Sequence, residues 1–119
     1  MKIVPEPEQQ SSLRTPRGLL LATMDIEEKH EADFNQWYDE EHFPERMGCP
    51  GFLWGARFRA LEGSPKYLAM YLLESPDVLN GDSYLAMSRA SPWTSRVSRN
   101  WGNFRRNVYE EITPPGGAD

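Results

Sequence analysis

The chain has 119 residues, of which 39% are hydrophobic and 12% aromatic, a composition typical of one globular domain. Its net charge of -5 argues against a general nucleic-acid-binding protein, and no apolar run approaches the roughly 20 residues of a membrane span. With Cys49 as its single cysteine, the sequence predicts neither an internal disulfide nor a cysteine zinc cluster. The amino terminus lacks the apolar core of a signal peptide, so we expect a cytoplasmic protein.

Both ends of the chain are rich in proline and show no hydrophobic periodicity. We therefore expect residues 1–16 to form a flexible amino-terminal arm and residues 113–119 a flexible tail. The folded domain is predicted at 17–112.

Four segments carry the apolar patterns of β-strands. Residues 18–25 and 67–73 are continuously apolar, which is typical of strands covered on both faces. Residues 52–60 alternate aromatic or small side chains with arginines, which indicates a half-exposed strand. In residues 103–112 apolar and polar side chains again fall on opposite sides, so we expect the last strand there.

The strand at 52–60 has two chemically different sides. Strict alternation places Phe52 and Trp54 on one side and Arg57 on the other. Arg57 could bind a carboxylate, and the alternative is a solvated charge on an edge strand.

The first helix is predicted over about 29–43. Acidic residues at its beginning suit the positive end of a helix dipole. We expect it to stop before Pro44, because proline disfavours helical geometry at Phe43, which leaves His42 in the last turn.

A serine–proline pair opens each of the two later helical segments, as an N-cap followed by a first-turn proline. The first of these is predicted over about 76–90, with Gly81 weakening its middle. The second is a short segment from Pro92 to about Val97.

The order strand, helix, strand, strand, helix, strand predicts an α+β, ferredoxin-like βαββαβ fold with a four-stranded antiparallel sheet. In that fold the first and third strands are central, and here these are the two continuously apolar ones. Central strands that are apolar on both faces need a cover, so we expect a homodimer with its sheets packed face to face. The alternative cover is the amino-terminal arm of the same chain.

A helix ending in histidine, a hydrophobic residue and proline, followed by a short loop and a Pro-Gly-Phe turn, resembles the dimeric α/β-barrel superfamily. It is most similar to the small members that include the ethyl tert-butyl ether degradation (EthD) protein and the stress-responsive barrel domains. The residues that carry the resemblance are Trp37-Tyr38-Asp39-Glu40-Glu41-His42-Phe43-Pro44 and Pro50-Gly51-Phe52. The similarity covers residues 18–112 and implies a dimeric α/β barrel. The superfamily contains cofactor-free monooxygenases, polyketide cyclases, muconolactone isomerases and haem proteins, so it implies a fold more specifically than an activity.

His42 is the first candidate for a reactive group. An imidazole titrates near neutral pH, and the negative end of a helix favours its charged form. In several cyclases and isomerases of the superfamily a histidine near the pocket is the general acid or base, so the resemblance implies this role for His42. The alternative is a structural residue that caps the helix.

Tyrosines and tryptophans are the expected partners of His42. Tyr38 or Tyr71 could donate a hydrogen bond to an enolate-like oxygen, which would place both among the catalytic residues. The expected substrate-binding residues are Trp37, Trp54, Tyr67, Trp93 and Arg57. Packing in the core or in a dimer interface is the alternative role for the aromatic ones.

We expect a small-molecule enzyme that uses cofactor-independent acid–base chemistry, as an isomerase, a cyclase or a monooxygenase-like protein, on a hydrophobic oxygenated or aromatic substrate. The alternatives are a non-catalytic ligand-binding or stress-associated dimer and a haem-binding member that uses His42. We expect no metal site, because His30 and His42 lie about 18 Å apart along an ideal helix.

Overall fold

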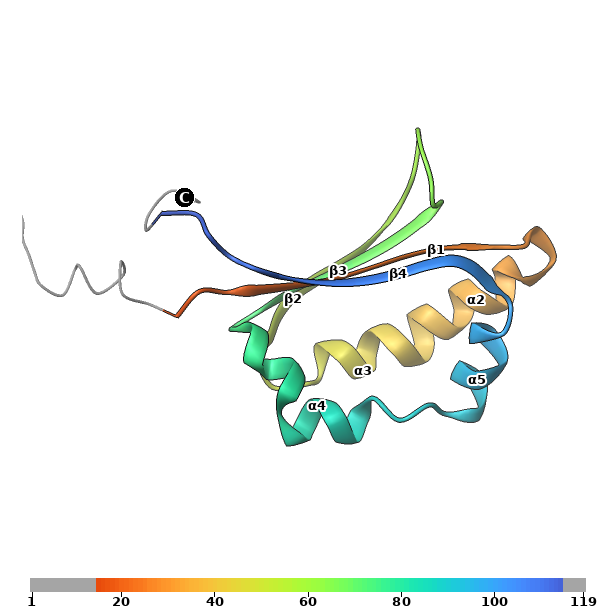
Figure 1. Ribbon diagram of the computed structural model, residues 1–119. Helices are drawn as coiled ribbons and strands as arrows, with labels where there is room; N and C mark the ends of the chain where they lie inside the picture. Colours follow the sequence, from red (N-terminus) through yellow and green to blue (C-terminus); the bar gives the residue numbers. More distant parts are fainter. Residues whose placement is uncertain (1–14, 115–119) are drawn as a thin grey trace, which may run out of the picture.

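Two apolar strands, β1 (Gly18–Ile26) and β3 (Tyr67–Leu73), form the centre of a four-stranded antiparallel sheet. The edge strands are β2 (Phe52–Arg59), beside β3, and β4 (Trp101–Glu110), beside β1, which gives the order β2-β3-β1-β4 (Figure 1). This computed structural model describes residues 15–114, so most of the expected arm and tail lies outside the described residues. The predicted ferredoxin-like α+β fold is confirmed, including which strands are central.

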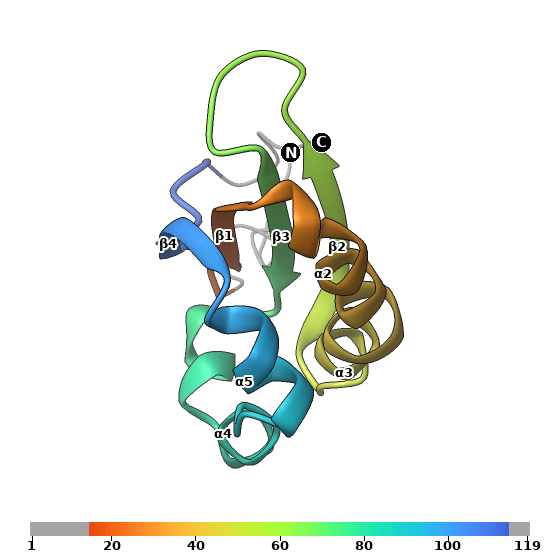
Figure 2. The same ribbon diagram turned by 90° about the vertical axis from the view of Figure 1, so that its right-hand side faces the viewer.

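All helical segments pack on one face of this sheet, as Figures 1 and 2 show. The segments after β1 form one helical rod: η1 (Glu28–His30), α2 (Glu31–Trp37), η2 (Tyr38–His42) and α3 (Phe43–Met47). The segments after β3 are η3 (Pro76–Asn80), α4 (Asp82–Met87) and α5 (Pro92–Ser98). No helix among residues 15–114 is long and apolar enough to cross a membrane.

The first helix does not stop at Pro44, which corrects the prediction. The segment η2 is a π-turn, in which the Phe43 N–H donates to the carbonyl of Tyr38, five residues earlier. Proline has no N–H to donate, and its ring clashes with the preceding turn of a regular helix. The wider π-turn leaves room for the ring and does not need the missing hydrogen bond. The rod therefore continues to Met47, and His42 lies inside it rather than in its last turn.

The second predicted helix is divided at Gly81, whose extended backbone (φ -82°, ψ 160°) separates η3 from α4. The predicted N-cap is present, because the Ser75 side chain accepts a hydrogen bond from the Asp77 N–H at 3.1 Å. The N-cap before α5 is present too, with Ser91 accepting from the Thr94 N–H at 3.0 Å.

A bulge in β2 overturns the predicted sides of that strand. Phe52 pairs with Leu73 while Trp54 already pairs with Leu72, so one extra residue lies between them. An extra residue reverses which side each later residue faces. Phe52 is therefore buried against the helices (7% exposed), whereas Trp54 lies on the opposite face of the sheet (49% exposed). Arg57 turns toward the helices, where it contacts residues of α2 and η2.

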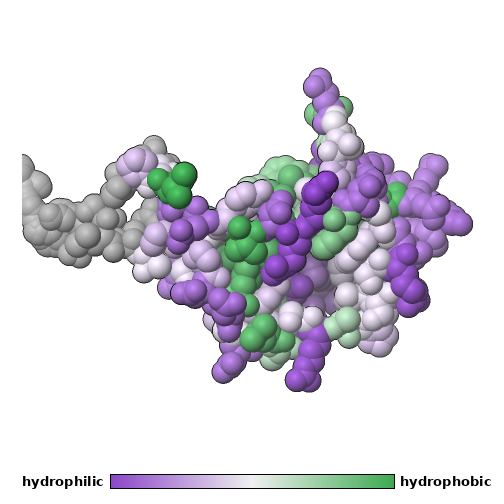
Figure 3. All heavy atoms as spheres, viewed as in Figure 1, coloured by the Kyte–Doolittle hydropathy of each residue, from purple (hydrophilic) through white to green (hydrophobic). Residues whose placement is uncertain are grey.

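The hydrophobic core lies between the sheet and the helices. Phe34 and Trp37 of α2 are fully buried and pack against alternate residues of the two central strands. The other sheet face carries Leu19, Leu21, Trp54, Phe58, Leu68, Met70, Leu72 and Tyr109. On the side of the molecule seen in Figure 3, hydrophobic patches lie among hydrophilic side chains.

Candidate functional site

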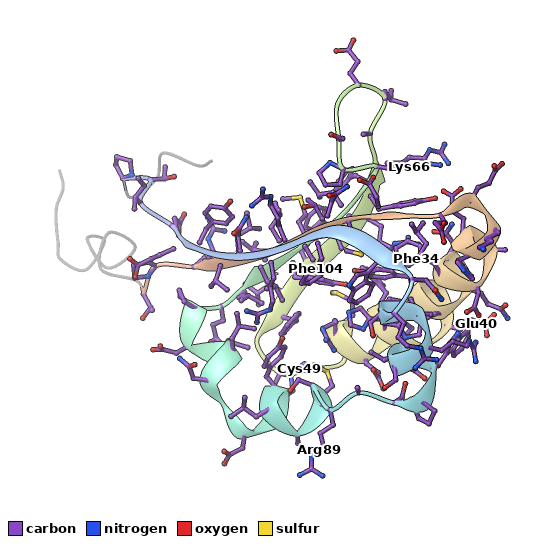
Figure 4. The ribbon with its side chains drawn as sticks, turned by 45° about the vertical axis from the view of Figure 1, so that its right-hand side comes forward. Phe34, Glu40, Cys49, Lys66, Arg89 and Phe104 are labelled. Carbon is purple, nitrogen blue, oxygen red and sulfur yellow. The ribbon has the colours of Figure 1, made fainter. Side chains whose placement is uncertain are left out.

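A cavity of about 160 Å³ lies between the sheet and the helices. Its hydrophobic lining consists of Leu20, Ala22, Met24, Trp37, Trp101 and Phe104. Its polar lining consists of Tyr38, His42, Arg46, Tyr71, Tyr84, Thr94 and Arg106. Figure 4 labels Phe104 on the β4 side of this cavity, next to the interior between sheet and helices. The cavity thus combines an apolar, aromatic wall with a small set of hydrogen-bonding and cationic groups, as ligand sites commonly do.

The imidazole of His42 is enclosed by aromatic rings. It stacks on Trp37 with ring centroids 4.4 Å apart, and the Tyr38 ring meets it edge-on at 5.0 Å. The pKa of His42 is lowered to about 3. Desolvation in the fold is the main cause, and the positive charges of Arg46 and Arg57 contribute the rest. His42 is therefore neutral at pH 7. This corrects the expectation of titration near neutrality, because the ring faces cations in a desolvated site rather than the negative end of a helix.

Tyr71 brings an unpaired hydroxyl to the same cavity. Its side chain is only 2% exposed, and its hydroxyl is the one buried side-chain oxygen or nitrogen among residues 15–114 that makes no hydrogen bond of good geometry, although the Tyr38 phenol lies close enough to affect its pKa. Such an unpaired buried group costs about 1–3 kcal/mol. A ligand oxygen in the cavity would offset that cost by accepting its proton in a hydrogen bond.

Both phenols at the cavity stay protonated at neutral pH. Burial raises the pKa of Tyr38 to about 12, against the opposing effect of the Arg57 and Arg46 charges. Burial also raises the pKa of Tyr71, and the neighbouring Tyr38 raises it further. Each phenol can therefore donate a hydrogen bond but does not act as a base.

A polar network fixes Trp37, on which His42 stacks. The indole Nε1 of Trp37 donates to the Thr94 hydroxyl at 3.0 Å. The Glu41 carboxylate accepts hydrogen bonds from the hydroxyls of both Ser91 and Thr94. These contacts tie α5 to the helical rod and hold the indole in one orientation. Sequence reasoning found Ser91 as an N-cap but gave no sign of its contact with Glu41, 50 residues away.

Two arginines at the cavity were missed by the sequence analysis. Arg46 places its guanidinium 5.6 Å from the centre of the Tyr84 ring, and Arg106 donates to the Tyr84 hydroxyl at 3.2 Å. No acidic side chain lines the cavity. Arg106 was visible in the sequence only as a polar residue of an edge strand, so no local pattern separated it from solvated arginines.

The structure brings Trp37, Tyr38, His42 and Tyr71 to one cavity but places the two other predicted tryptophans elsewhere. Trp54 lies on the opposite face of the sheet because of the bulge in β2. Trp93 packs outside the cavity, where its indole Nε1 donates to the Asp33 carboxylate at 3.0 Å. Neither residue can stack on a ligand in this cavity.

Tyr67 and Arg57 also lie outside the cavity lining. The Tyr67 hydroxyl donates to the Glu31 carboxylate at 2.6 Å, so it is already satisfied. Arg57 donates to the Asn35 side chain at 2.7 Å and lies over the Tyr38 ring at 4.2 Å. It therefore affects the cavity through its charge rather than by contact with a ligand.

Among residues 15–114, no three histidine, cysteine, aspartate or glutamate side chains lie close enough together to hold a metal ion. Cys49 is buried, and burial raises the pKa of its thiol, which disfavours a thiolate nucleophile.

No protein-family model matches the sequence, and a comparison with curated proteins finds no significant match. Solved structures do match. An EthD-family protein from Bacillus halodurans is 16% identical, with a TM-score of 0.56 over 82% of this chain and 100% of that one. A haem-degrading protein from Mycobacterium tuberculosis is 15% identical, with a TM-score of 0.58 over 87% of this chain and 100% of that one.

The chain has the ferredoxin-like fold of these solved structures. A variant of SnoaB, a cofactor-independent oxygenase from Streptomyces nogalater, shares this fold at 12% identity and a TM-score of 0.51, over 78% of this chain and 90% of that one. The resemblance noted in the sequence is thus confirmed at the level of the ferredoxin-like fold. At such identities the likeness carries the fold and not the chemistry.

Proposed function

We propose that this chain is a small-molecule enzyme of the monooxygenase-like barrel type, which uses cofactor-independent acid–base chemistry on a compact aromatic or hydrophobic oxygenated substrate. One observation carries the proposal. The neutral imidazole of His42 and the unpaired, buried hydroxyl of Tyr71 line the same small cavity. A proton acceptor and a hydrogen-bond donor at one site are what proton abstraction next to a carbonyl requires.

In the proposed step, the substrate carbonyl oxygen accepts a hydrogen bond from Tyr71 while His42 removes a proton from the adjacent carbon. The electron pair of the broken C–H bond forms the enolate, whose negative oxygen the Tyr71 hydroxyl stabilises. Return of the proton from His42 to another carbon gives an isomer, and attack of the enolate carbon on a second carbonyl gives a ring. If dioxygen is the acceptor, the enolate is oxidised, a C–O bond forms, and the reduced peroxide oxygen takes the proton from His42.

The cavity volume limits the substrate to about one ring. A cavity of about 150 Å³ is known to hold benzene, which is close to the 160 Å³ found here. Pockets for drug-sized ligands measure roughly 300–1,000 Å³. Haem is at least as large as such ligands, so the cavity of this single chain is too small to enclose it. Adding haemin and recording a Soret band tests the haem alternative, and we expect none.

Two single-ring ketones test the proposal. Phenylpyruvate and benzyl methyl ketone each carry a benzylic C–H next to a carbonyl, and its exchange in deuterated water is measured by proton NMR, with oxygen uptake followed by electrode. We expect exchange or uptake above the buffer rate for at least one ketone, with loss of at least about 100-fold in His42→Ala. His30→Gln is the matched control and should keep the full rate. Wild-type rates equal to those of His42→Ala would overturn the proposal.

A non-catalytic ligand-binding dimer is the second candidate. The observation that favours it is the low pKa of His42, about 3, which makes the imidazole a weak base. In that case His42→Ala lowers the melting temperature, through the lost stacking on Trp37, without changing any exchange rate.

The proposal includes a second copy of the chain on the open sheet face. That face is apolar along both central strands, and Trp54, Phe58 and Tyr109 are each close to half exposed on it. A stable interface needs roughly 800 Å² from each partner, which a whole sheet face can supply. We expect light scattering to give a dimer for the full chain and a monomer for Phe58→Glu, with Leu61→Glu, 93% exposed in a loop, as the control. A monomeric wild type would refute the dimer. The expected cytoplasmic location stays a prediction.

A further inference from the structure

Two guanidinium groups meet at one residue of the cavity wall. Arg46 comes from α3 and Arg106 from β4, so they approach from different walls. Arg46 lies over the face of the Tyr84 ring, 5.6 Å from its centre, while Arg106 bonds to the hydroxyl of the same ring at 3.2 Å.

Neither guanidinium has a counter-ion within residues 15–114. Arg57 and Arg96, which pack against the same helical rod, each bond to a carboxylate of that rod. No carboxylate lines the cavity, so the charges of Arg46 and Arg106 add at its wall without compensation. Arg46 is partly buried and Arg106 is exposed, so water weakens the repulsion between their charges without removing it, and an anion bound between them replaces that repulsion with attraction.

We propose that the cavity binds a small aromatic carboxylate, with the carboxylate group between Arg46 and Arg106 and the ring on the aromatic wall. That wall consists of Trp37, Trp101 and Phe104. A planar carboxylate suits guanidinium donors, which bind it through paired hydrogen bonds. This inference rests on the proposed function, since it names the substrate class of the same site.

A bound carboxylate also changes the basicity of His42, the proposed proton acceptor. The His42 ring faces Arg46 from α3 and Arg57 from β2, with the phenols of Tyr38 and Tyr71 as its other polar neighbours. An anion beside Arg46 offsets one of these positive charges, which raises the pKa of His42 from its low value in the empty cavity. A higher pKa makes His42 a stronger base, so the substrate class that fits the arginines also activates the imidazole.

The test compares two isosteric, non-reacting ligands, hydrocinnamate and its neutral amide. Binding is measured by calorimetry at low salt and by the intrinsic tryptophan fluorescence, to which Trp37 and Trp101 of the cavity contribute. We expect hydrocinnamate to bind at least about tenfold more tightly than the amide, the effect of one or more charged hydrogen bonds. Arg46→Gln and Arg106→Gln should each remove roughly tenfold of hydrocinnamate affinity and leave the affinity for the amide unchanged.

Arg89→Gln is the matched control, because it removes the same charge from a side chain that points away from the molecule in Figure 4. If an arginine variant fails to fold, the wild type still gives a result. Its His42 pKa, followed by NMR, should rise on addition of hydrocinnamate and not on addition of the amide. The inference is overturned by equal affinity for the two ligands, by absence of saturable hydrocinnamate binding, or by an equal loss in Arg89→Gln.

Binding and turnover separate the two proposals. Arginine-dependent hydrocinnamate binding without any exchange at phenylpyruvate supports the carboxylate site and contradicts the enzyme. Exchange at benzyl methyl ketone without preference for hydrocinnamate supports the enzyme and contradicts the carboxylate site.

Discussion

The imidazole of His42 stacks on the indole of Trp37 although the two residues are five positions apart, with ring centroids 4.4 Å apart and planes inclined by 26°. In a regular α-helix, residues five apart lie about 140° apart around the axis and cannot stack. The π-turn of η2 makes this pair possible, because it fits more residues into one turn. The backbone irregularity before Pro44 is therefore the cause of the site's geometry.

The partly buried imidazole of His42 predicts a specific pH dependence of stability. The pKa of His42 is about 3 in the folded chain and 6.5 in its ordinary state, so between these values only the unfolded chain binds the proton. Stability should fall as the pH drops below about 6.5, by up to about 1.4 kcal/mol per pH unit from this group. Denaturant unfolding between about pH 7 and pH 5.5, above most of the carboxylate titration, measures the slope. We expect a shallower slope in His42→Gln than in the wild type; equal slopes in the two proteins would contradict the assignment.

The unpaired hydroxyl of Tyr71 predicts an unusual mutational result. Tyr71→Phe removes a buried polar atom without a partner, so it should leave the free energy of unfolding unchanged or raise it by up to about 1 kcal/mol. Tyr67→Phe removes a hydroxyl bonded to Glu31 and should lower it by about 1–2 kcal/mol. Denaturant unfolding of both variants is the measurement, and a larger loss in Tyr71→Phe than in Tyr67→Phe would refute the prediction. If the proposed function is correct, Tyr71→Phe also loses activity.

Thr94 is predicted to act as a positioning residue. Thr94→Val keeps the side-chain shape but removes the hydroxyl that accepts from Trp37 and donates to Glu41. We expect a loss of about 1–2 kcal/mol in stability and a shifted Trp fluorescence spectrum, since the indole loses its fixed partner. Ser98→Ala, in the same helix, removes only a hydroxyl bonded within that helix and should leave the spectrum unchanged. An unaltered spectrum in Thr94→Val would show that packing alone holds the indole.

Gly55 of β2 is predicted to be required for the position of Tyr71. A Cβ atom at this site would lie 2.7 Å from the Tyr71 ring and 2.9 Å from the Met47 sulfur, so Gly55→Ala forces both side chains to move. Overpacking of this kind typically costs about 1–3 kcal/mol. Gly102→Ala is the control, because a Cβ there meets no atom within 4 Å. Thermal melting of both variants decides the prediction, and equal melting temperatures would contradict it.

The sequence was sufficient for the fold because hydrophobic pattern and topology depend on many residues at once. The continuous apolar runs identified the two central strands, and Ser75 marked a helix start through its short polar side chain. Two of the errors in local structure each came from one inserted residue. The π-turn before Pro44 and the bulge between Phe52 and Trp54 both change periodicity without any strong local signal.

The candidate site was only partly accessible to sequence reasoning. Tyr38, His42 and Tyr71 reach one cavity, and two of them come from the helix that carries the recognised motif. Arg46 and Arg106 were missed because their common neighbour, Tyr84, is 38 and 22 residues away in the chain (84 − 46 and 106 − 84). Which arginine lacks a counter-ion is a property of tertiary packing and not of composition.

The π-turn also shows how the helical rod accommodates one extra residue. A single π-turn holds about one residue more than a regular turn, so the residues after it point nearly as they would in a regular helix that is one residue shorter. Deletion of one exposed residue of this turn, such as Glu40, would allow α2 and α3 to merge into a regular helix. Arg46 would then keep nearly the same direction relative to Trp37, because the lost residue and the tighter turn change the rotation by about 100° in opposite senses. A related chain can thus carry the same site with one residue fewer between Trp37 and His42.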